Sequence, residues 1–389
     1  MKILILNRDY PRFLADMYAS APALSVATYA EQLAARNASL FGVADFYSHG
    51  FAAAGHSARE IHVNNPWLQS AWAREHGVRT PAPPAIGPQR RLSPGLSLIK
   101  GIARRTLLPL ARRFMPRQIR KEEERVLAAQ IEQMKPDVIL NQELSYIRTQ
   151  CLDRIVPRGT KIVGQSASAL PIGENFKRYD LLISSLPNFV ELFQSEGARA
   201  VLSPLAFDAR VLDSIGPPAA RDIDVSFVGS LSADHRARVV LIEALARELP
   251  LKVWGSGVDE LPPSSAIRAC FQGEAWGREM YGVLARSRIT INQHIDLADG
   301  FSNNMRLYEA TGCGALMIVD RGRNLQSIFE PEKEVISYRS AEECVEAVRY
   351  ALSAPAAAAE VAAAGQRRTL SEHSYVRRTA DLGQILLQL

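Results

Sequence analysis

Arg306 and Glu309 are the residues whose types and spacing first suggest chemistry, within DGFSNNMRLYEATGCGALMIVD at residues 299–320. Three-residue spacing places both side chains on one face of a helix, so a short helix would present a cation and a carboxylate to one ligand. A helix start adds free N–H groups and a partial positive charge, which favour phosphate. The pair therefore indicates a site for a phosphorylated ligand, and a solvated surface ion pair is the alternative.

The same segment predicts the elements that position this pair. Ser302 and Asn303 are residue types that cap the start of a helix, and Gly312 and Gly314 favour its end. The apolar run ALMIV is typical of a buried strand. Because the glycines leave little space between helix and strand, we expect the segment at the carboxyl edge of a parallel sheet, where ligands bind.

The chain has 389 residues, which is more than one ordinary core requires and predicts two domains. Its 47% hydrophobic and 22% charged residues are typical of a globular protein. No apolar run is long enough to span a membrane, and the opening MKILIL is too short for a signal-peptide core. We therefore expect a buried first strand and a cytoplasmic protein.

The four cysteines show no C-x-x-C spacing, and the seven histidines show no metal-ligand spacing. We expect reduced thiols, no metal site and no cofactor.

The formal net charge of +5 is unevenly placed, since residues 90–121 carry ten basic side chains and no acidic one. This stretch belongs to a Pro-containing insertion at about residues 66–121 and mixes Leu, Ile and Phe with arginines. Peripheral contact with an anionic membrane is one interpretation, and a solvated basic surface is the other. Aromatic residues for base stacking are nearly absent from it, which argues against a nucleic-acid partner.

Two strand ends in the first half carry residues suited to the acceptor side of a reaction. The first strand is followed by NRDYPRF, which places Asp9 beside Asn7 and Tyr10. Glu143 follows the strand VIL, where a carboxylate can take a proton from an attacking hydroxyl. Turn residues around Pro11 and a helix cap at Glu143 are the alternatives.

The rest of the first half alternates between helical and extended patterns. A helical stretch over about residues 24–53 leads to the strand IHVNN, and further strands follow at KIVG and LLIS. This alternation favours a parallel sheet with helices on both faces.

Glycines mark two strand ends in the second half. VSFVGS ends in Gly229 and Ser230, where a backbone without a side chain lets a ligand approach closely. LKVWGSG contributes Gly255 but lacks the third glycine and the acidic residue of a dinucleotide-binding fingerprint. The strand ITINQHID carries His294 towards the same edge, as a candidate catalytic residue near the sugar or as a satisfied core residue.

Taken in order, these pieces resemble the carboxyl-terminal half of a GT-B glycosyltransferase of the broad family 4-like group, closest to the CgeB-type branch. The matching pieces are VSFVGS, Arg238 in the following helix, LKVWGSG, FQGEAWG, ARSRITINQHID, NMRLYEATGCGALMIVD and the EVISYRSAEE strand and helix. The resemblance covers roughly residues 200–380 well, and the amino-terminal half matches mainly in pattern.

The resemblance implies an α/β protein with the GT-B fold, in which two Rossmann-like domains with parallel sheets face each other across a cleft. The implied acceptor-side domain is 1–207 and the linker is 208–221. The nucleotide-sugar-binding domain would be 222–372, and a helix at 373–389 would cross back to the first domain.

The implied activity is metal-independent transfer of a sugar from a nucleotide-diphosphate donor, with UDP favoured, to a glycan, lipid-linked or protein acceptor. Arg238 and Arg306 would bind the diphosphate, with Arg236 as the competitor of Arg238, and Glu309 would bind the ribose hydroxyls. The other implied donor-binding residues are Gly229, Ser230, Gly255, Gly273, Glu274, Trp276, Ser302, Asn303 and Asn304. The catalytic candidates are Asp9, Glu143 and His294.

One position departs from the family pattern. Family 4 enzymes have two glutamates eight positions apart, but the position eight before Glu309 is Phe301, which cannot hydrogen-bond a sugar hydroxyl. CgeB-type proteins tolerate this difference, and Asp299 is near enough in sequence to substitute. A catalytically silent glycan- or nucleotide-binding module and a same-fold sugar-nucleotide epimerase are therefore the alternative functions.

Overall fold

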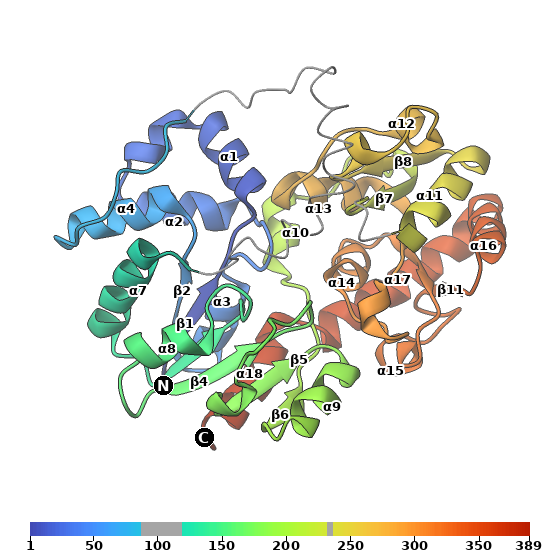
Figure 1. Ribbon diagram of the computed structural model, residues 1–389. Helices are drawn as coiled ribbons and strands as arrows, with labels where there is room; N and C mark the ends of the chain where they lie inside the picture. The colour runs from blue at the N-terminus through green and yellow to red at the C-terminus, as the bar shows by residue number, and fades with distance from the viewer. Residues whose placement is uncertain (87–118, 232–235) are drawn as a thin grey trace.

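The computed structural model describes residues 1–86, 119–231 and 236–389, which form two α/β domains lying side by side (Figure 1). Each domain is built on one parallel sheet. Within the described residues, no helix has both the length and the apolar character needed to cross a membrane.

The first domain contains a six-stranded sheet in which paired strands are parallel. Its strand order is β2 (Ser57–His62), β1 (Lys2–Asn7), β3 (Val138–Asn141), β4 (Lys161–Gln165), β5 (Leu181–Ser184) and β6 (Ala200–Leu202). The central strands are almost fully buried because helices cover both faces of the sheet. The helices are α1 (Pro11–Ser20), η1 (Pro22–Val26), α2 (Tyr29–Ala38), α3 (Phe46–Ala53), α4 (Pro66–Glu75), α7 (Lys121–Met134), α8 (Thr149–Ile155), η2 (Phe176–Arg178) and α9 (Pro187–Ser195).

The second domain contains a five-stranded parallel sheet. Its strand order is β11 (Ile336–Tyr338), β10 (Leu316–Asp320), β9 (Ser287–Asn292), β7 (Ile223–Val228) and β8 (Leu251–Trp254). The connection from the first domain contains α10 (Arg210–Ile215). The helices of the second sheet are α11 (Arg236–Glu248), η4 (Val258–Glu260), α12 (Ala266–Cys270), α13 (Gly277–Arg286), η5 (Asp296–Ala298), α14 (Met305–Gly312), α15 (Leu325–Ile328) and α16 (Ala341–Ser353).

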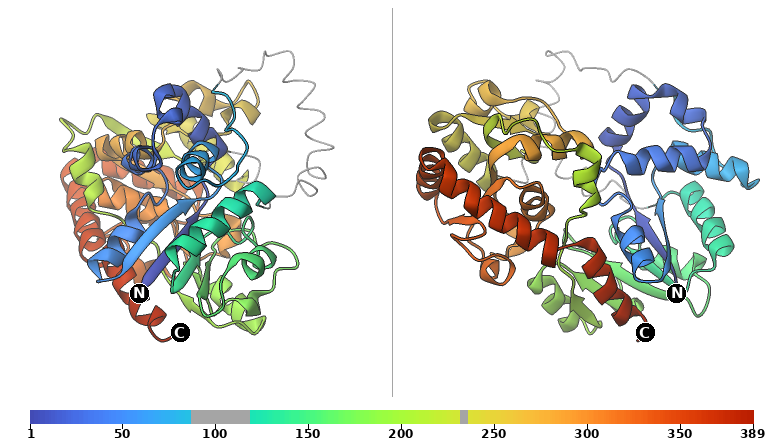
Figure 2. Two further views of the ribbon diagram at one scale, coloured as in Figure 1. Left: turned by 90° about the vertical axis from the view of Figure 1, so that its left-hand side faces the viewer. Right: turned by 180° about the vertical axis from the view of Figure 1, so that it is seen from behind.

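The carboxyl end of the chain returns to the first domain. α17 (Pro355–Glu372) packs against α14 and β10, and α18 (Tyr375–Leu386) then packs on α3 (Figure 2). Backbone hydrogen bonds fix the crossing, since Phe207 donates to the carbonyl of His373 at 2.8 Å and accepts from Tyr375 at 3.1 Å. The two segments that connect the domains are therefore bonded to each other.

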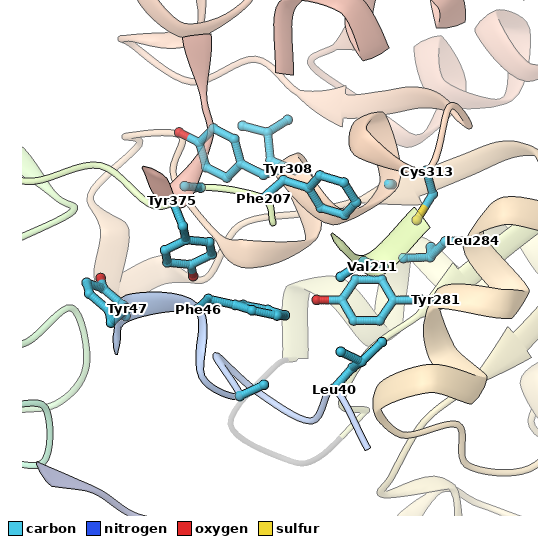
Figure 3. Close-up of a cluster of buried hydrophobic side chains, with 14 of the residues drawn as sticks. Leu40, Phe46, Tyr47, Phe207, Val211, Tyr281, Leu284, Tyr308, Cys313 and Tyr375 are labelled. Atoms are coloured by element: carbon cyan, nitrogen blue, oxygen red, sulfur yellow. The ribbon is translucent and has the colours of Figure 1, made fainter. Parts of the chain in front are cut away.

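One buried cluster contains aromatic side chains from both domains (Figure 3). Phe46 and Tyr47 come from α3, Tyr281 from α13 and Tyr375 from α18. The ring centroids of Tyr47 and Tyr375 are 5.1 Å apart in an edge-to-face arrangement. Because aromatic pairs of this kind add to the burial of apolar area, the cluster helps to hold the two domains in one orientation.

The helical stretch predicted over about 24–53 is helical for most of its length, but it is not one helix. The chain forms η1, α2 and α3 instead, and a turn separates α2 from α3. Leu40, Gly42 and Ala44 in this turn have φ angles of 57°, 59° and 42°. Because a left-handed backbone cannot continue a right-handed helix, the stretch breaks there. The turn carries Phe41 and the backbone of Ser39 towards the second domain.

Candidate active site

The carboxyl edges of the two sheets face each other. Asn303, which follows β9, donates a hydrogen bond to the backbone carbonyl of Ser185, which follows β5. Tyr10 follows β1, and its ring centroid lies 6.2 Å from that of Trp276 in the second domain. Ligands of doubly wound sheets bind outside these edges, so residues of both domains can contact one bound molecule.

α14 places Arg306 and Glu309 at the carboxyl edge of the second sheet. Its N-cap is Asn304, whose side chain accepts a hydrogen bond from the N–H of Leu307. The Nη1 of Arg306 lies 2.6 Å from the Oε2 of Glu309, and its Nε donates to the carbonyl of Val228 at 3.0 Å. Arg306 is thereby joined to the end of β7 and is not a freely solvated surface side chain.

Glu309 is only 4% exposed, and both of its carboxylate oxygens have partners. Oε1 accepts a hydrogen bond from the hydroxyl of Tyr281 at 3.3 Å. Burial, together with the charge of Glu309, holds the pKa of Tyr281 well above its usual range, so this hydroxyl stays a donor. Each oxygen of a carboxylate has a second acceptor position, which leaves capacity for a ligand hydroxyl.

The predicted helix-start residues have three different roles. Ser302 is fully buried, and its N–H donates to the Oδ1 of Asn324 at 2.6 Å. Asn303 bridges the domains through Ser185, and Asn304 caps α14 while exchanging side-chain hydrogen bonds with Asn292 at 3.0 and 3.2 Å. The cap therefore lies later than the sequence predicted, and only Asn304 lies at the helix start.

The structure brings the three predicted glycines together beside the ends of β7 and β8. Gly229 donates to the carbonyl of Trp254, and Gly255 donates to the carbonyl of Gly273, both at 3.0 Å. Gly255 has a φ of +146°, and a Cβ there would lie 1.8 Å from the carbonyl oxygen of Gly229. Only glycine permits this close approach of the two strand ends.

Arg238 lies on α11 over the ends of β7 and β9. It donates to the carbonyls of Ser230 at 3.1 Å and Gln293 at 2.8 Å. Its Nε is buried and has no hydrogen-bond partner among the described residues. Burial lowers the pKa of Arg238, and the nearby charge of Arg306 acts in the same direction. Two guanidinium groups held near each other favour an anionic ligand. Arg236, the sequence competitor of Arg238, is exposed.

Glu274 and Trp276 contact the first domain. Glu274 forms an ion pair with Arg12 of α1 at 2.7 Å. Trp276 packs edge-to-face on Phe41 and Tyr10, and its buried Nε1 lies beside the carboxylate of Glu274. The FQGEAWG segment thus lines the boundary between the domains.

His294 follows β9 and is held by Asp320 at the end of β10. Its Nδ1 lies 2.8 Å from the Oδ1 of Asp320, which also accepts the backbone N–H of His294 at 3.0 Å. The side chain is 5% exposed, and its Nε2 has no hydrogen-bond partner within the described part of the chain. Asp320 therefore fixes the orientation of the ring, and the buried Nε2 keeps an unused hydrogen-bonding position.

Asp9 is buried within the first domain. Its carboxylate is held by Arg36 through Oδ1 and lies 3.2 Å from the Nδ1 of His62 through Oδ2. Burial alone would raise the pKa of Asp9, but the charges and hydrogen bonds of His62 and Arg36 lower it overall. This arrangement is typical of a structural carboxylate, and Asp9 remains a catalytic candidate by prediction only.

Glu143 is partly exposed at the end of β3. Burial raises its pKa to about 7, although Arg8 lowers it. The pKa of Tyr10 is raised, first by desolvation of its hydroxyl group and then by the charge of Glu143, so this hydroxyl lies near Glu143 although the residue as a whole is exposed. Since Tyr10 also contacts Trp276, Glu143 lies on the side of the first domain that faces the second. A carboxyl group with a pKa near neutrality suits general base catalysis.

Three residues of this region were missed in the sequence. Arg8 stands in the same loop as Asp9, and Asp320 ends the run ALMIVD, so both could have been found as charged residues at strand ends. Tyr281 lies inside α13 and had no comparable signal, because its contact with Glu309 joins residues 28 positions apart.

Phe301 packs against the core of the first domain. Ala298 and Phe301 contact the buried cluster that contains Leu186 and Phe189. Asn188 supports this contact by donating to the carbonyl of Leu297 at 3.2 Å. The position that carries a glutamate in the family pattern is thus part of the interface between the domains.

Among the described residues, no group of three or more His, Cys, Asp or Glu is placed to hold a metal ion.

Residues 236–384 match the family described as glycosyl transferase-like. No curated protein matches the chain in sequence. The structure is similar to that of Anabaena Alr3699/HepE in complex with UDP-glucose, with a TM-score of 0.57, 12% identity and 100% of each chain covered. It is also similar to a glycosyltransferase from Rickettsia africae ESF-5 (TM-score 0.53, 12% identity) and to sucrose-phosphate synthase from Thermosynechococcus elongatus (0.55, 13%). Each of these alignments covers 100% of this chain and 98% of the other. At such identities the likeness concerns the fold, and it confirms the predicted fold class, GT-B with two Rossmann-like domains.

Proposed function

We propose that this chain, a glycosyltransferase of the GT-B fold, transfers a sugar from a UDP-sugar to an acceptor hydroxyl without a metal ion or other cofactor. The position of Arg306 and Glu309 carries the proposal. The pair lies at the carboxyl edge of the second sheet, is anchored to β7 through Val228, and belongs to the segment matched by the glycosyl transferase-like family.

Arg238 and Arg306 would stabilise the departing diphosphate. Negative charge grows on the leaving group as the glycosidic bond breaks, so fixed donors aimed at it lower the barrier. Both guanidinium groups are already oriented by backbone carbonyls, at the ends of β7 and β9. Each donor of this kind is worth about 3 kcal/mol in the transition state. The charge that a metal ion provides in other transferases would thus come from side chains.

Glu309 would accept hydrogen bonds from the ribose hydroxyls. Its carboxylate is buried and fixed by Tyr281 and Arg306, so it offers a rigid acceptor. Hydrogen bonds to a charged group contribute about 1.5 to 3 kcal/mol, so Glu309 should govern donor affinity more than the chemical step.

Glu143 would act as the general base. The acceptor hydroxyl transfers its proton to the carboxylate of Glu143 while the acceptor oxygen forms a bond to the anomeric carbon and the bond to UDP breaks. A direct displacement of this kind inverts the anomeric configuration, which product analysis by NMR can check. His294, oriented by Asp320, would contact the sugar or the diphosphate through Nε2.

UDP is the favoured nucleotide because the similar Anabaena protein was solved in complex with UDP-glucose, with UDP and glucose, and with UDP. We also propose the CgeB-type branch, which is supported by Phe301 at the position eight before Glu309. The acceptor would be a glycan, a lipid-linked molecule or a protein.

Calorimetry with UDP, GDP and dTDP, each with and without EDTA, tests the donor assignment. We expect UDP to bind in the micromolar range or tighter, with no loss in EDTA, and slow hydrolysis of a UDP-sugar when no acceptor is present. Failure of all three nucleotides to bind would reject the proposal, and binding that requires a divalent cation would reject metal independence.

A catalytically silent GT-B module is the second candidate. The docking of Phe301 against the first domain favours it, because the position then contacts protein and not a sugar. Binding of UDP without any hydrolysis of UDP-sugars would support this reading over the first.

Peripheral membrane contact remains a separate proposal. This proposal is based on the basic stretch at 90–121. Residues 90–118 of this stretch lie outside the described residues. Flotation with liposomes of anionic lipid checks it, with recovery in neutral liposomes as the comparison. Equal recovery from both would remove the proposal.

A further inference from the structure

Among the described residues, Arg8 at the carboxyl edge of the first sheet forms no ion pair. Its guanidinium carbon lies 4.7 Å from the ring centroid of Tyr146. Its Nε is buried and has no hydrogen-bond partner, and Arg8 forms no ion pair with any residue in the described ranges. Stacking on an aromatic ring offsets only part of the cost of removing a guanidinium from water, since it contributes about 0.5 to 2 kcal/mol.

Within the described residues, neither Asp9, the next residue in the chain, nor Glu143 forms an ion pair with Arg8. Asp9 is engaged by Arg36 and His62. Glu143 is close enough for its pKa to be lowered by Arg8, yet burial raises that pKa to about 7, so near neutral pH Glu143 carries only part of a negative charge. Arg8 is therefore not fully neutralised by either of these two carboxylates.

Two further features surround this charge. α1 begins at Pro11 with no side-chain cap and no acidic residue in its first turn, which adds the partial positive charge of a helix start. Tyr10 is 60% exposed and lies next to Glu143, so its ring offers an apolar face at the same place. A cation, a proton acceptor and an exposed aromatic ring match a sugar that carries an acid.

We propose that Arg8 binds a carboxylate or phosphate group of the acceptor and so makes the enzyme selective for an acidic sugar acceptor. This inference rests on the proposed function. The anionic group pairs with the guanidinium of Arg8, the ring of the acceptor packs on Tyr10, and its hydroxyl lies within reach of Glu143. The proton of that hydroxyl goes to the carboxylate of Glu143, the acceptor oxygen bonds to the anomeric carbon, and UDP leaves with the bonding electrons.

Calorimetric titration of D-glucuronate, D-glucose 6-phosphate and D-glucose into the protein, with and without UDP, tests the proposal. We expect at least tenfold tighter binding of one or both anions than of glucose. The two anions distinguish a carboxylate-selective site from a phosphate-selective one. Arg8→Gln should remove the preference, whereas Arg8→Lys should keep part of it, because a point charge pairs with an anion less specifically than a guanidinium does.

Arg349→Gln is the matched control, since Arg349 is an exposed arginine in α16 that pairs with Glu248. It should leave all affinities unchanged. Equal affinity for the three sugars, no measurable binding of either anion, or an unchanged preference in Arg8→Gln would each overturn the proposal.

UDP affinity, measured with the same samples, separates this proposal from the function on which it rests. If UDP binds but no anion preference exists, only the acceptor assignment fails. If UDP does not bind, the transferase assignment itself fails. If Arg8→Gln bound UDP more weakly, Arg8 would be assigned to the donor site, and the proposal would also be overturned.

Discussion

Arg306 joins Glu309 to the end of β7, because one guanidinium pairs with the carboxylate at 2.6 Å and donates its Nε to the carbonyl of Val228 at 3.0 Å. The acid that we assign to the ribose and the cation that we assign to the diphosphate are therefore mechanically coupled. Removing either group should also disturb the orientation of the other, so their effects should not be additive.

Glu309→Gln should weaken UDP binding by about tenfold, which corresponds to about 1.4 kcal/mol, because the amide lacks the charge that strengthens bonds to ribose hydroxyls. Calorimetry with UDP gives this value directly. We expect kcat at saturating donor to change less than the affinity does. An unchanged affinity would show that the carboxylate is structural and only supports Arg306.

Arg238→Gln should lower kcat by about 100-fold, since a donor that acts on developing charge is worth about 3 kcal/mol. Arg236→Gln is the control, because Arg236 stands in the same turn of α11 and is exposed. Steady-state kinetics with a UDP-sugar compares the two variants. Equal losses in both, or none in either, would contradict the assignment of Arg238.

Glu143→Gln should lower kcat by about 100- to 10,000-fold, the range associated with general base catalysis. In the native protein, kcat/KM should rise with pH and level off above about 7, because the carboxylate is the active form and burial raises the pKa of Glu143 to about 7. The variant should retain UDP affinity and lose this pH dependence. An inflection near 7 that persists in the variant would assign it to another group.

Gly277→Ala should disturb the contact between the domains. Gly277 has a φ of +50°, and a Cβ there would lie 2.0 Å from the backbone carbonyl oxygen of Ser39. Gly55→Ala is the matched control, because Gly55 also has a positive φ of +83° but no atom of the described residues lies within 4 Å of its added Cβ. Both variants should lose about 1 kcal/mol of stability through backbone strain. Only Gly277→Ala should lower kcat/KM, by tenfold or more, and equal activity in both would contradict a role for this contact.

Glu60→Gln should change how stability depends on pH. Burial raises the pKa of Glu60 from 4.5 to about 8, and its Oε2 is buried without a hydrogen-bond partner among the described residues. The folded protein therefore binds this proton more tightly than the unfolded chain, and stability falls as pH rises between these values. Relative to the variant, the native protein should lose about 3 kcal/mol between pH 5.5 and 8.

Urea unfolding at the two pH values measures the effect of Glu60. Glu132→Gln, at an exposed position of α7, should show no such difference from the native protein. A pH dependence shared by the native protein and Glu60→Gln would contradict the assignment.

The sequence predicted the elements whose pattern is local. Apolar runs such as ALMIV and LLIS became β10 and β5. The helical stretch over 24–53 is interrupted because Leu40 and Ala44 adopt a left-handed backbone conformation that neither residue type signals. This turn also contacts the second domain, and such long-range contacts leave no pattern in the local sequence.

The residues of the candidate site could be predicted only where the residue type and its spacing along one element both indicated the same role. Arg306 and Glu309 share a helix face, so their spacing was informative. By contrast, the burial of Asp9 depends on Arg36 and His62, which come from other elements. The cap of α14 was misplaced within SNN because serine and asparagine are both good capping residues, and only the pairing of Asn304 with Asn292 distinguishes them.

The N–H of Arg278 donates to the carbonyl of Ser39 at 2.8 Å, and both atoms belong to the main chain. Replacing either side chain with another L-residue other than proline leaves both atoms in place. At this contact, the relative orientation of the two domains therefore depends on the length and backbone conformation of the turn after α2, and not on the two side chains. Insertions or deletions in the turn after α2 should therefore change the relative orientation of the domains more than point substitutions at Ser39 or Arg278 do.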